Sequence, residues 1–416
     1  MNDTTPARAA RTSHTPGTVG TAGPATERTW LADVVVVGAR CAGAATAMLL
    51  ADAGHDVLLV DRASFPSDTV STHVIARTGM VQLNRWGLLD ALHDSGAPPL
   101  TTVEIDAGDD LLVRTIKDRH GVDHLLAPRR IVLDDILQDA ARRSGARVAT
   151  GVSVDGVLRD ERGRVVGVRA HDELGGIRIL ARNVVGADGL GSRVARSVGA
   201  PLTLTRPTSG AALYAYFAGD WPSIEYHVGD HALSGVFPTH GGQACVWVCT
   251  PEEVARRHQR RGPRESVLTD LVAELTPRLR DRVRAADQTS PVRGMLRMPN
   301  HFRQAAGPGW ALVGDAGYHR DAITGYGISD AFRDAELLAT ALDAALRDPA
   351  DETAPLTAYG RDRDRMARPV FDITNELATF PGADRFVELQ KQLARVIDDQ
   401  AGELAARPSP ARAAVA

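Results

Sequence analysis

The sequence predicts an α/β fold in which a Rossmann-type domain carries an inserted antiparallel β-sheet domain and is followed by C-terminal helices. Three observations predict this fold class. A strand–turn–helix–strand pattern occupies residues 33–62, strand-like alternation dominates residues 211–250, and helical spacing extends from 355 to 404. With 416 residues, 44% of them apolar, the chain is long enough to bury the cores of two domains.

The stretch that organises the chain reads DVVVVGARCAGAATAMLLADAGHDVLLVDR, from Asp33 to Arg62. A β-branched run at 33–37 predicts a strand, Gly38 and Gly43 bracket a turn, and an Ala/Leu-rich segment follows at helical spacing. A second apolar run predicts another strand that ends on an acidic residue. This order of elements is typical of a dinucleotide-binding site.

Each residue of that motif has a physical task. Gly38 allows a tight turn, Gly43 lets the helix pack close to the sheet, and the amides of the first helical turn face a pyrophosphate. Asp61 is placed to accept hydrogen bonds from a ribose. Arg40 stands where the motif has its second glycine. We expect its side chain either to turn away from the phosphates or to clamp them.

Charge and cysteine content exclude several functional classes. The net charge of −4 gives no reason to expect nucleic acid as a partner. Cys41, Cys245 and Cys249 fit no zinc spacing, so we expect no metal and a reducing cytoplasm. Residues 1–29 predict a disordered tail, and the sequence shows neither a signal peptide nor a membrane span. We therefore expect a soluble cytoplasmic protein, as a monomer or homodimer.

Aromatic residues crowd one region of the predicted sheet. Seven of the 19 aromatic residues lie between positions 214 and 247. They can form one wall of an apolar pocket or the core of the sheet, and both can hold for different faces. Thr72 and His73, near a predicted helix start, either touch the ligand or act as an N-cap and a satisfied histidine. The substrate-pocket candidates are Thr72, His73, Tyr214, Tyr216, Tyr226, Phe237 and Trp247.

A second glycine-led helix start lies far along the chain. A buried strand at 310–313 is broken by Gly314-Asp315, and a long loop leads to Gly325 and Gly327, after which a helix is predicted. Such a helix end is a second site that can receive an anion.

Three separated segments resemble the single-component FAD-dependent monooxygenases related to para-hydroxybenzoate hydroxylase, the group A flavoprotein hydroxylases. They are Gly38 to Gly43 with Asp61, Gly186 to Gly189, and Gly314-Asp315 with the loop to Gly327. The resemblance implies that these segments bind one FAD, with the last helix end facing the flavin pyrimidine. The cofactor-binding residues it implies are Gly38, Arg40, Cys41, Ala42, Gly43, Asp61, Arg62, Arg130, Val154, Asp188, Gly189, Asp315, Gly325, Gly327 and Ile328.

The resemblance also implies a reaction. FAD is reduced by NADPH or NADH and reacts with dioxygen to a flavin hydroperoxide, which transfers one oxygen atom to an electron-rich small metabolite, aromatic or polyketide-like, as in secondary metabolism. His319 is the candidate catalytic residue beside the reacting atoms, with a hydrogen-bonding role within its loop as the alternative. The implied partners are a small-molecule substrate and dioxygen.

Departures from the family pattern keep other functions open. The family often has an alanine and a histidine after Gly-Asp-Ala, and prolines before the last glycines; this chain has Gly317, Tyr318, Asp321 and Ala322. The sequence AITGYGIS also resembles the geranylgeranyl reductases, so a reductase of carbon–carbon double bonds is the alternative. A flavin halogenase is less favoured, because no lysine precedes Lys117. A flavin-binding carrier or sensor without turnover is a further alternative.

The resulting division of the chain has four parts: a tail (1–29), an FAD-binding domain (30–97, 127–200 and 291–350), a substrate-binding β-sheet region (98–126 and 201–290) and a C-terminal helical region (351–416).

Overall fold

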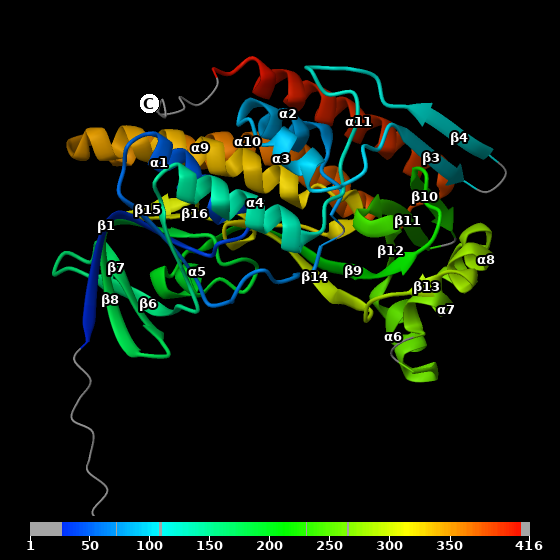
Figure 1. Ribbon diagram of the computed structural model, residues 1–416, viewed down its shortest axis with the longest axis horizontal. Coiled ribbons are helices and arrows are strands. Elements are labelled where there is room, and N and C mark those ends of the chain that lie inside the picture. The colour runs from blue at the N-terminus through cyan, green and yellow to red at the C-terminus, as the bar shows by residue number, and fades with distance from the viewer. Residues whose placement is uncertain (1–26, 72, 108–109, 230, 264–265, 409–416) are drawn as a thin grey trace, which may run out of the picture.

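The structure is a computed structural model that describes residues 27–71, 73–107, 110–229, 231–263 and 266–408. Two sheets, each covered by helices, lie side by side along the long axis of the molecule (Figure 1). The predicted α/β fold class is therefore confirmed.

The first sheet has eight strands, and its central strands run parallel. Its order is β15-β16-β8-β1-β2-β5, with β7 pairing with β8 and β6 pairing with β7. The strand β1 pairs in parallel with β2, which is the arrangement that the 33–62 pattern predicts, and it also pairs in parallel with β8. The strands of this sheet are β1 (Arg28–Val37), β2 (Val57–Asp61), β5 (Arg147–Thr150), β6 (Ser153–Arg159), β7 (Val165–Asp172), β8 (Gly175–Gly186), β15 (Ala306–Gly307) and β16 (Trp310–Leu312).

The strand β1 begins earlier than its β-branched run suggests. Arg28 and Thr29 pair with Ile177 and Arg178 of β8, so the end of the expected tail is part of the sheet. The long antiparallel arm formed by β7 and β8 supplies the partner backbone that extends β1. Residues 1–26 of the expected tail lie outside the described residues.

Helices cover both faces of the first sheet. On one face α1, α4 and α9 share a core that includes Leu50, Leu133 and Phe332. On the other face α5 packs with the β6–β7 arm. These helices are α1 (Cys41–Asp52), α4 (Arg130–Arg143), α5 (Arg193–Val198) and α9 (Gly327–Arg347).

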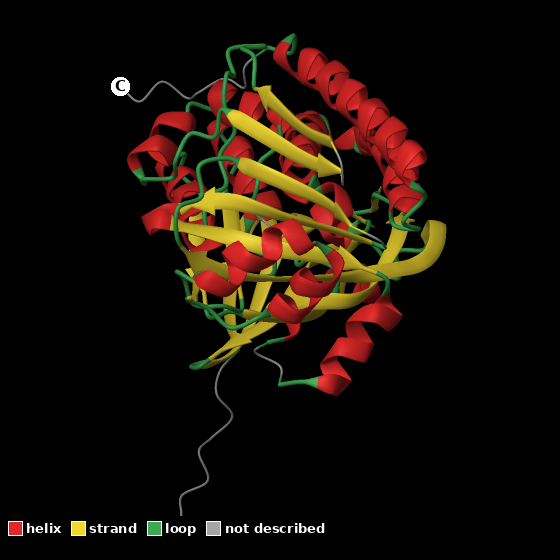
Figure 2. Ribbon diagram, turned by 90° about the vertical axis from the view of Figure 1, so that its right-hand side faces the viewer, coloured by secondary structure: helices red, strands yellow, loops and turns green. Residues whose placement is uncertain are grey.

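The second sheet has nine strands, in the order β17-β14-β9-β12-β11-β10-β3-β4, with β13 pairing with β9. Figure 2 shows its long strands stacked between helices. The strands are β3 (Thr102–Ala107), β4 (Asp110–Thr115), β9 (Leu202–Ala218), β10 (Ile224–Gly229), β11 (Ala232–Thr239), β12 (Gln243–Thr250), β13 (Asp287–Gln288), β14 (Arg293–Arg303) and β17 (Tyr318–His319).

The pairing of β14 differs from the sequence-based division. Residues 291–350 were assigned to the FAD-binding domain, yet β14 and β17 belong to the second sheet, because the 17-residue strand β9 offers β14 a long edge. The chain therefore passes between the two sheets again after residue 303.

Each face of the second sheet has its own helical cover. The helices α7 and α8 pack on Leu213, Phe217 and Val246, whereas α10 and α11 lie over the face that carries Tyr214 and Trp247. Pro277 is the first residue of α8, a position that suits proline because the first helical amide has no partner within the helix. The remaining helices are α2 (Arg77–Arg85), α3 (Leu89–Asp94), α6 (Glu252–Arg261), α7 (Val267–Leu275), α8 (Pro277–Ala285), α10 (Thr353–Leu377) and α11 (Ala383–Ala405). Among the described residues, no helix combines the length and apolarity needed to cross a membrane.

Candidate functional site

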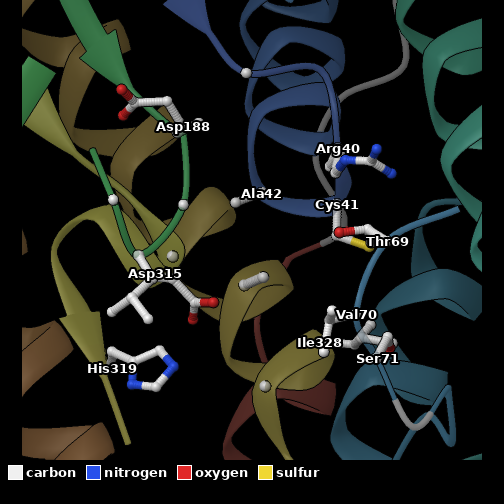
Figure 3. A pocket seen from close by; sticks show the side chains of 18 of the residues that line it. Arg40, Cys41, Ala42, Thr69, Val70, Ser71, Asp188, Asp315, His319 and Ile328 are labelled. Carbon is white, nitrogen blue, oxygen red and sulfur yellow. The ribbon is translucent and has the colours of Figure 1, made fainter. Parts of the chain in front are cut away.

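One large cavity, of about 1010 Å³, collects the three glycine-containing segments. Its wall includes the turn after β1, residues 187–191 after β8, residues 314–315 and the start of α9. A fourth segment, residues 69–71 with 73–74, closes it opposite Asp315 and His319 (Figure 3). Segments remote in sequence thus meet around a single space.

The turn between β1 and α1 leaves no room for side chains. Gly38 has a φ of 108°, and its amide donates to the carbonyl of Val60 at 2.8 Å. A Cβ atom on Gly43 would lie 1.7 Å from the carbonyl oxygen of Gly38. The structure therefore places Gly43 behind the turn and not on the cavity wall, where we expected it. The absence of a side chain on Gly43 allows the close packing that keeps residues 38–42 in position. These residues border the cavity together with the first amides of α1, which have no hydrogen-bond partner within the helix.

The side chain of Arg40 turns sideways. It donates to Asp134 at 2.8 Å and to the hydroxyl of Ser67 at 3.1 Å, and it lies 5.2 Å from the ring centre of Phe65. The same carboxylate accepts two hydrogen bonds from Arg130 at one of its oxygens. Asp134 is fully buried, and its carboxylate connects two arginines of the cavity wall, Arg40 and Arg130. Asp134 was not among the residues predicted from the sequence, although its position four residues after Arg130 on a helix is a signal for such an ion pair.

Asp61 ends β2 at the cavity wall, next to Arg62. Its two carboxylate oxygens accept hydrogen bonds from the amides of Ala39 (2.7 Å) and Ala63 (2.8 Å). These bonds orient the carboxylate, and each oxygen keeps a lone pair for a hydroxyl donor.

Asp188 and Gly189 follow β8 and line the cavity next to the turn between β1 and α1. Asp188 accepts hydrogen bonds from the hydroxyl of Ser192 at 2.6 Å and from the amide of Arg193 at 2.6 Å, so it holds the start of α5. Val154 also lines the cavity, and its carbonyl accepts a hydrogen bond from Arg193.

The start of α9 forms the other end of the cavity. Gly325 has a φ of 61°, and a Cβ atom on Gly327 would meet no atom within 4 Å, so the space before this helix end is open. The first helical hydrogen bond runs from the amide of Asp330 to the carbonyl of Tyr326, which leaves the preceding amides without a helical partner. Ile328 and Asp315 flank this helix end (Figure 3).

His319 lies on the cavity wall beside Asp315. Its Nδ1 atom donates to the carbonyl of Pro299 at 2.6 Å, and its ring stacks 6.3 Å from that of His301. Burial, together with the positive charge of Arg303 and the proximity of His319, lowers the pKa of His301 to about 4. Both readings of His319 are compatible with this position, because one nitrogen serves the loop while the ring borders the cavity.

The aromatic strands divide between cavity and core. Tyr214 and Trp247 line the large cavity. Tyr216, Tyr226 and Phe237 do not; the last two border a small separate cavity with Trp247, and all three belong to the core beneath α10 and α11. These three residues share a face of the second sheet with Tyr214 and Trp247, but the structure does not place them on the wall of the large cavity.

His73 lines the cavity, whereas Thr72 lies outside the described residues. The helix that follows, α2, begins only at Arg77, so His73 is not at a helix start.

A buried charge network, unexpected from the sequence, lies behind the α9 end of the cavity. Arg320 pairs with Asp330, and Arg333 pairs with both Asp330 (2.6 Å) and Asp334 (2.7 Å). Burial raises the pKa of Asp334 to about 6, against the opposing effect of Arg333. No local pattern distinguishes these residues from an exposed, charged helix face. Other wall residues that the sequence analysis missed are Cys249, Met295, Met298, Tyr318 and Tyr326.

Comparisons with known proteins agree with this geometry. The FAD binding domain family matches residues 31–374. Among curated proteins, the chain is 28% identical to menaquinone reductase of Mycobacterium tuberculosis over 375 residues, which covers 84% of this chain and 85% of the relative. It is 27% identical to digeranylgeranylglycerophospholipid reductase of Methanocella arvoryzae, over 72% of this chain and 74% of the relative.

A solved structure shares the fold. PqsL of Pseudomonas aeruginosa, described as a probable FAD-dependent monooxygenase, superposes with a TM-score of 0.75 at 24% identity, over 87% of this chain and 100% of that one. Because the family match spans most of the sequence, the chain belongs to the FAD binding domain family, as its resemblance to the para-hydroxybenzoate hydroxylase-like flavoproteins predicts, and it is an FAD-dependent oxidoreductase.

Proposed function

We propose that this protein is an FAD- and NAD(P)H-dependent monooxygenase that inserts one oxygen atom from dioxygen into an electron-rich small metabolite of aromatic or polyketide-like character. The observation that supports this proposal is the continuity of the cavity. It extends from the α1 helix end and Asp61, through Asp188 and Asp315, to the α9 helix end and the aromatic wall of the second sheet.

The residues present fit FAD. The free amides at the start of α1, with Arg40 and Arg130 beside them, would hold the pyrophosphate, and Asp61 would hold the adenosine ribose. The open space before Gly327 would admit the flavin ring. Bound FAD supplies the redox chemistry, taking electrons from reduced nicotinamide and delivering them to dioxygen.

The chain's own contribution lies at the ring end. The amides of Gly327 and Ile328 would face the flavin pyrimidine and stabilise negative charge there. Tyr214, Trp247 and Met298 would exclude water from the substrate and hold an apolar ring in position. His319 would lie next to the reacting atoms, with its orientation held by the carbonyl of Pro299.

A reductase of carbon–carbon double bonds is the second candidate. Two observations favour it: the TGYGI sequence at residues 324–328, and the two curated relatives whose names are those of reductases. The same cavity would then hold an unsaturated apolar chain or ring beside the flavin.

Oxygen dependence separates the candidates. The FAD-loaded protein would be mixed with NADPH or NADH and a panel of phenols, quinones and polyketide-like aromatics, in air and without oxygen, and products would be weighed after reaction under heavy-isotope dioxygen. The proposal predicts substrate-stimulated NAD(P)H oxidation and one heavy oxygen atom in the product. Equal product without oxygen would reject it in favour of the reductase, and no NAD(P)H oxidation with any compound would favour a flavin-binding protein without turnover.

A further inference from the structure

His73 lies at the cavity wall, where residues 73–74 meet the second sheet. Only 1% of the surface of His73 is exposed to solvent. Its ring is stacked on Tyr216, with 5.4 Å between the ring centres and 4° between the planes, and Tyr214 contacts it edge-on at 5.8 Å. Two rings of β9 therefore hold the imidazole in one orientation.

The two nitrogens of this imidazole differ in their partners. Nε2 forms a hydrogen bond with the hydroxyl of Tyr216, whereas Nδ1 is buried and has no hydrogen-bond partner among the described residues. Buried polar atoms are nearly always paired in folded proteins. Because His73 borders the cavity, a ligand bound there is the expected partner of Nδ1.

The Tyr216 hydroxyl determines which nitrogen of His73 carries the proton. Burial raises the pKa of this phenol, so it keeps its proton, and among the described residues Nε2 of His73 is the only hydrogen-bond acceptor found for it. The guanidinium of Arg129 lies 4.3 Å from the centre of the Tyr216 ring and makes the hydroxyl a better donor. When Nε2 accepts, the proton of a neutral imidazole is on Nδ1.

The surroundings also keep this imidazole uncharged. Burial, followed by the positive charges of Arg130 and Arg129 and the proximity of His240, lowers the pKa of His73 well below its usual value. The negative charge of Asp68 acts on the neighbouring Tyr216, and this carboxylate is paired with Arg129 at 2.7 Å. The side chain is thus a neutral donor at neutral pH.

We propose that His73 is a substrate-binding residue whose neutral imidazole donates a hydrogen bond from Nδ1 to an oxygen atom of the substrate, and that Tyr216 is the positioning residue that sets this tautomer. The substrate class is then an apolar ring or conjugated system that carries a phenol, enol or carbonyl oxygen, with Tyr214 and Trp247 beside its carbon skeleton. A neutral N–H donor can form a hydrogen bond with a carbonyl oxygen, a hydroxyl oxygen or an ionised phenolate oxygen. The inference rests on the proposed function for what happens to this substrate, but the hydrogen bond itself requires no turnover.

The tautomer can be observed directly. In the full-length FAD-loaded protein labelled with nitrogen-15 histidine, the His73 signals are assigned by their loss in His73→Asn. We expect the form protonated on Nδ1 alone at pH 7. Tyr216→Phe should shift His73 toward the other tautomer, whereas the matched variant Tyr214→Phe should not, because the Tyr214 hydroxyl donates to the carbonyl of Thr69 instead. A charged His73, or one protonated on Nε2 in the wild type, would overturn the proposal.

Ligand binding gives an independent reading. The probes are 1-naphthol and naphthalene, which share a ring system and differ in one hydroxyl, with binding followed by the flavin absorbance. We expect the wild type to bind 1-naphthol about tenfold more tightly. His73→Leu should abolish this preference while leaving naphthalene affinity unchanged, and His73→Asn should restore part of it through its amide N–H. Equal affinity of the wild type for both probes, or an undiminished preference in His73→Leu, would refute the hydrogen bond.

The two proposals fail in different ways. If the monooxygenase proposal is wrong, no compound of the panel acquires heavy oxygen while the naphthol preference and the His73 tautomer persist. If the His73 inference is wrong, the preference or the tautomer is missing while oxygen transfer to the panel is retained.

Discussion

Replacement of Gly43 by alanine tests whether the turn between β1 and α1 holds FAD through its backbone. The added Cβ atom would lie 1.7 Å from the carbonyl oxygen of Gly38 and 3.0 Å from the Cβ atom of Ala187, whereas real Cβ contacts are essentially never shorter than 3.0 Å. The obstructing atom belongs to the backbone, so no flexible side chain can move aside. The turn itself has to shift.

The size of the effect follows from that displacement. Overpacking of this kind costs about 1–3 kcal/mol of folding free energy. A shifted turn also misaligns the amides at the start of α1, and the loss of one hydrogen bond to a charged phosphate costs about 1.5–3 kcal/mol. We therefore expect FAD affinity to fall by roughly 10- to 150-fold.

The assay is a titration of the apoprotein with FAD, followed by the quenching of flavin fluorescence. The matched control is Gly382→Ala, because Gly382 has an ordinary negative φ of −53° and a Cβ atom there would meet nothing within 4 Å. The control should bind FAD like the wild type. A Gly43→Ala protein that binds FAD with wild-type affinity would refute the assignment of this turn to the pyrophosphate.

Three further outcomes are expected. Asp61→Ala removes the carboxylate that accepts from the amides of Ala39 and Ala63 and that would contact the ribose. It should weaken FAD binding by about 1–3 kcal/mol in the same titration. Unchanged affinity would exclude Asp61 from the site. Asp134→Ala leaves Arg40 and Arg130 without their shared carboxylate and should lower the free energy of unfolding, measured in urea, by about 3–5 kcal/mol. The control Asp139→Ala removes the exposed pair with Arg142 and should lower it by less than about 1 kcal/mol. The depressed pKa of His301, about 4, means that the folded protein binds fewer protons than the unfolded chain between pH 4 and about 6.5. Stability should therefore be retained above about pH 6.5 and should fall on acidification, by roughly 1–2 kcal/mol at pH 5 from this group. His301→Asn should remove that part of the slope in thermal unfolding measured across pH, and an identical slope in both proteins would contradict the argument.

Local patterns predicted much of the fold and the position of the cavity. The 33–62 pattern predicted β1, α1 and β2 in their order, and the two glycine-led helix ends predicted the two ends of the cavity. These features are local. A strand or helix shows its period in its own sequence, and a glycine indicates a backbone conformation or a close approach that a side chain would prevent.

Pairings between distant segments were not predictable in the same way. The sequence predicted no partner for the strand β14, and its pairing with β9 in the second sheet appears only in the structure, because the sequence of a strand does not specify which strand it pairs with. The aromatic run from 214 to 247 predicted a wall, but only the packing of distant segments determined that Tyr214 and Trp247 line the large cavity while Tyr226 and Phe237 do not.

By itself, the sequence determined that this chain builds an α/β fold with two glycine-led helix ends, since backbone sterics and the periodicity of apolar residues are properties of short segments. The contacts of Arg40 with Asp134, and of His73 with Tyr216, a residue 143 positions away, form only in the folded chain. The physical reason is that a side-chain hydrogen bond depends on distance and angle in space, and neither is written in the spacing of residues along a chain.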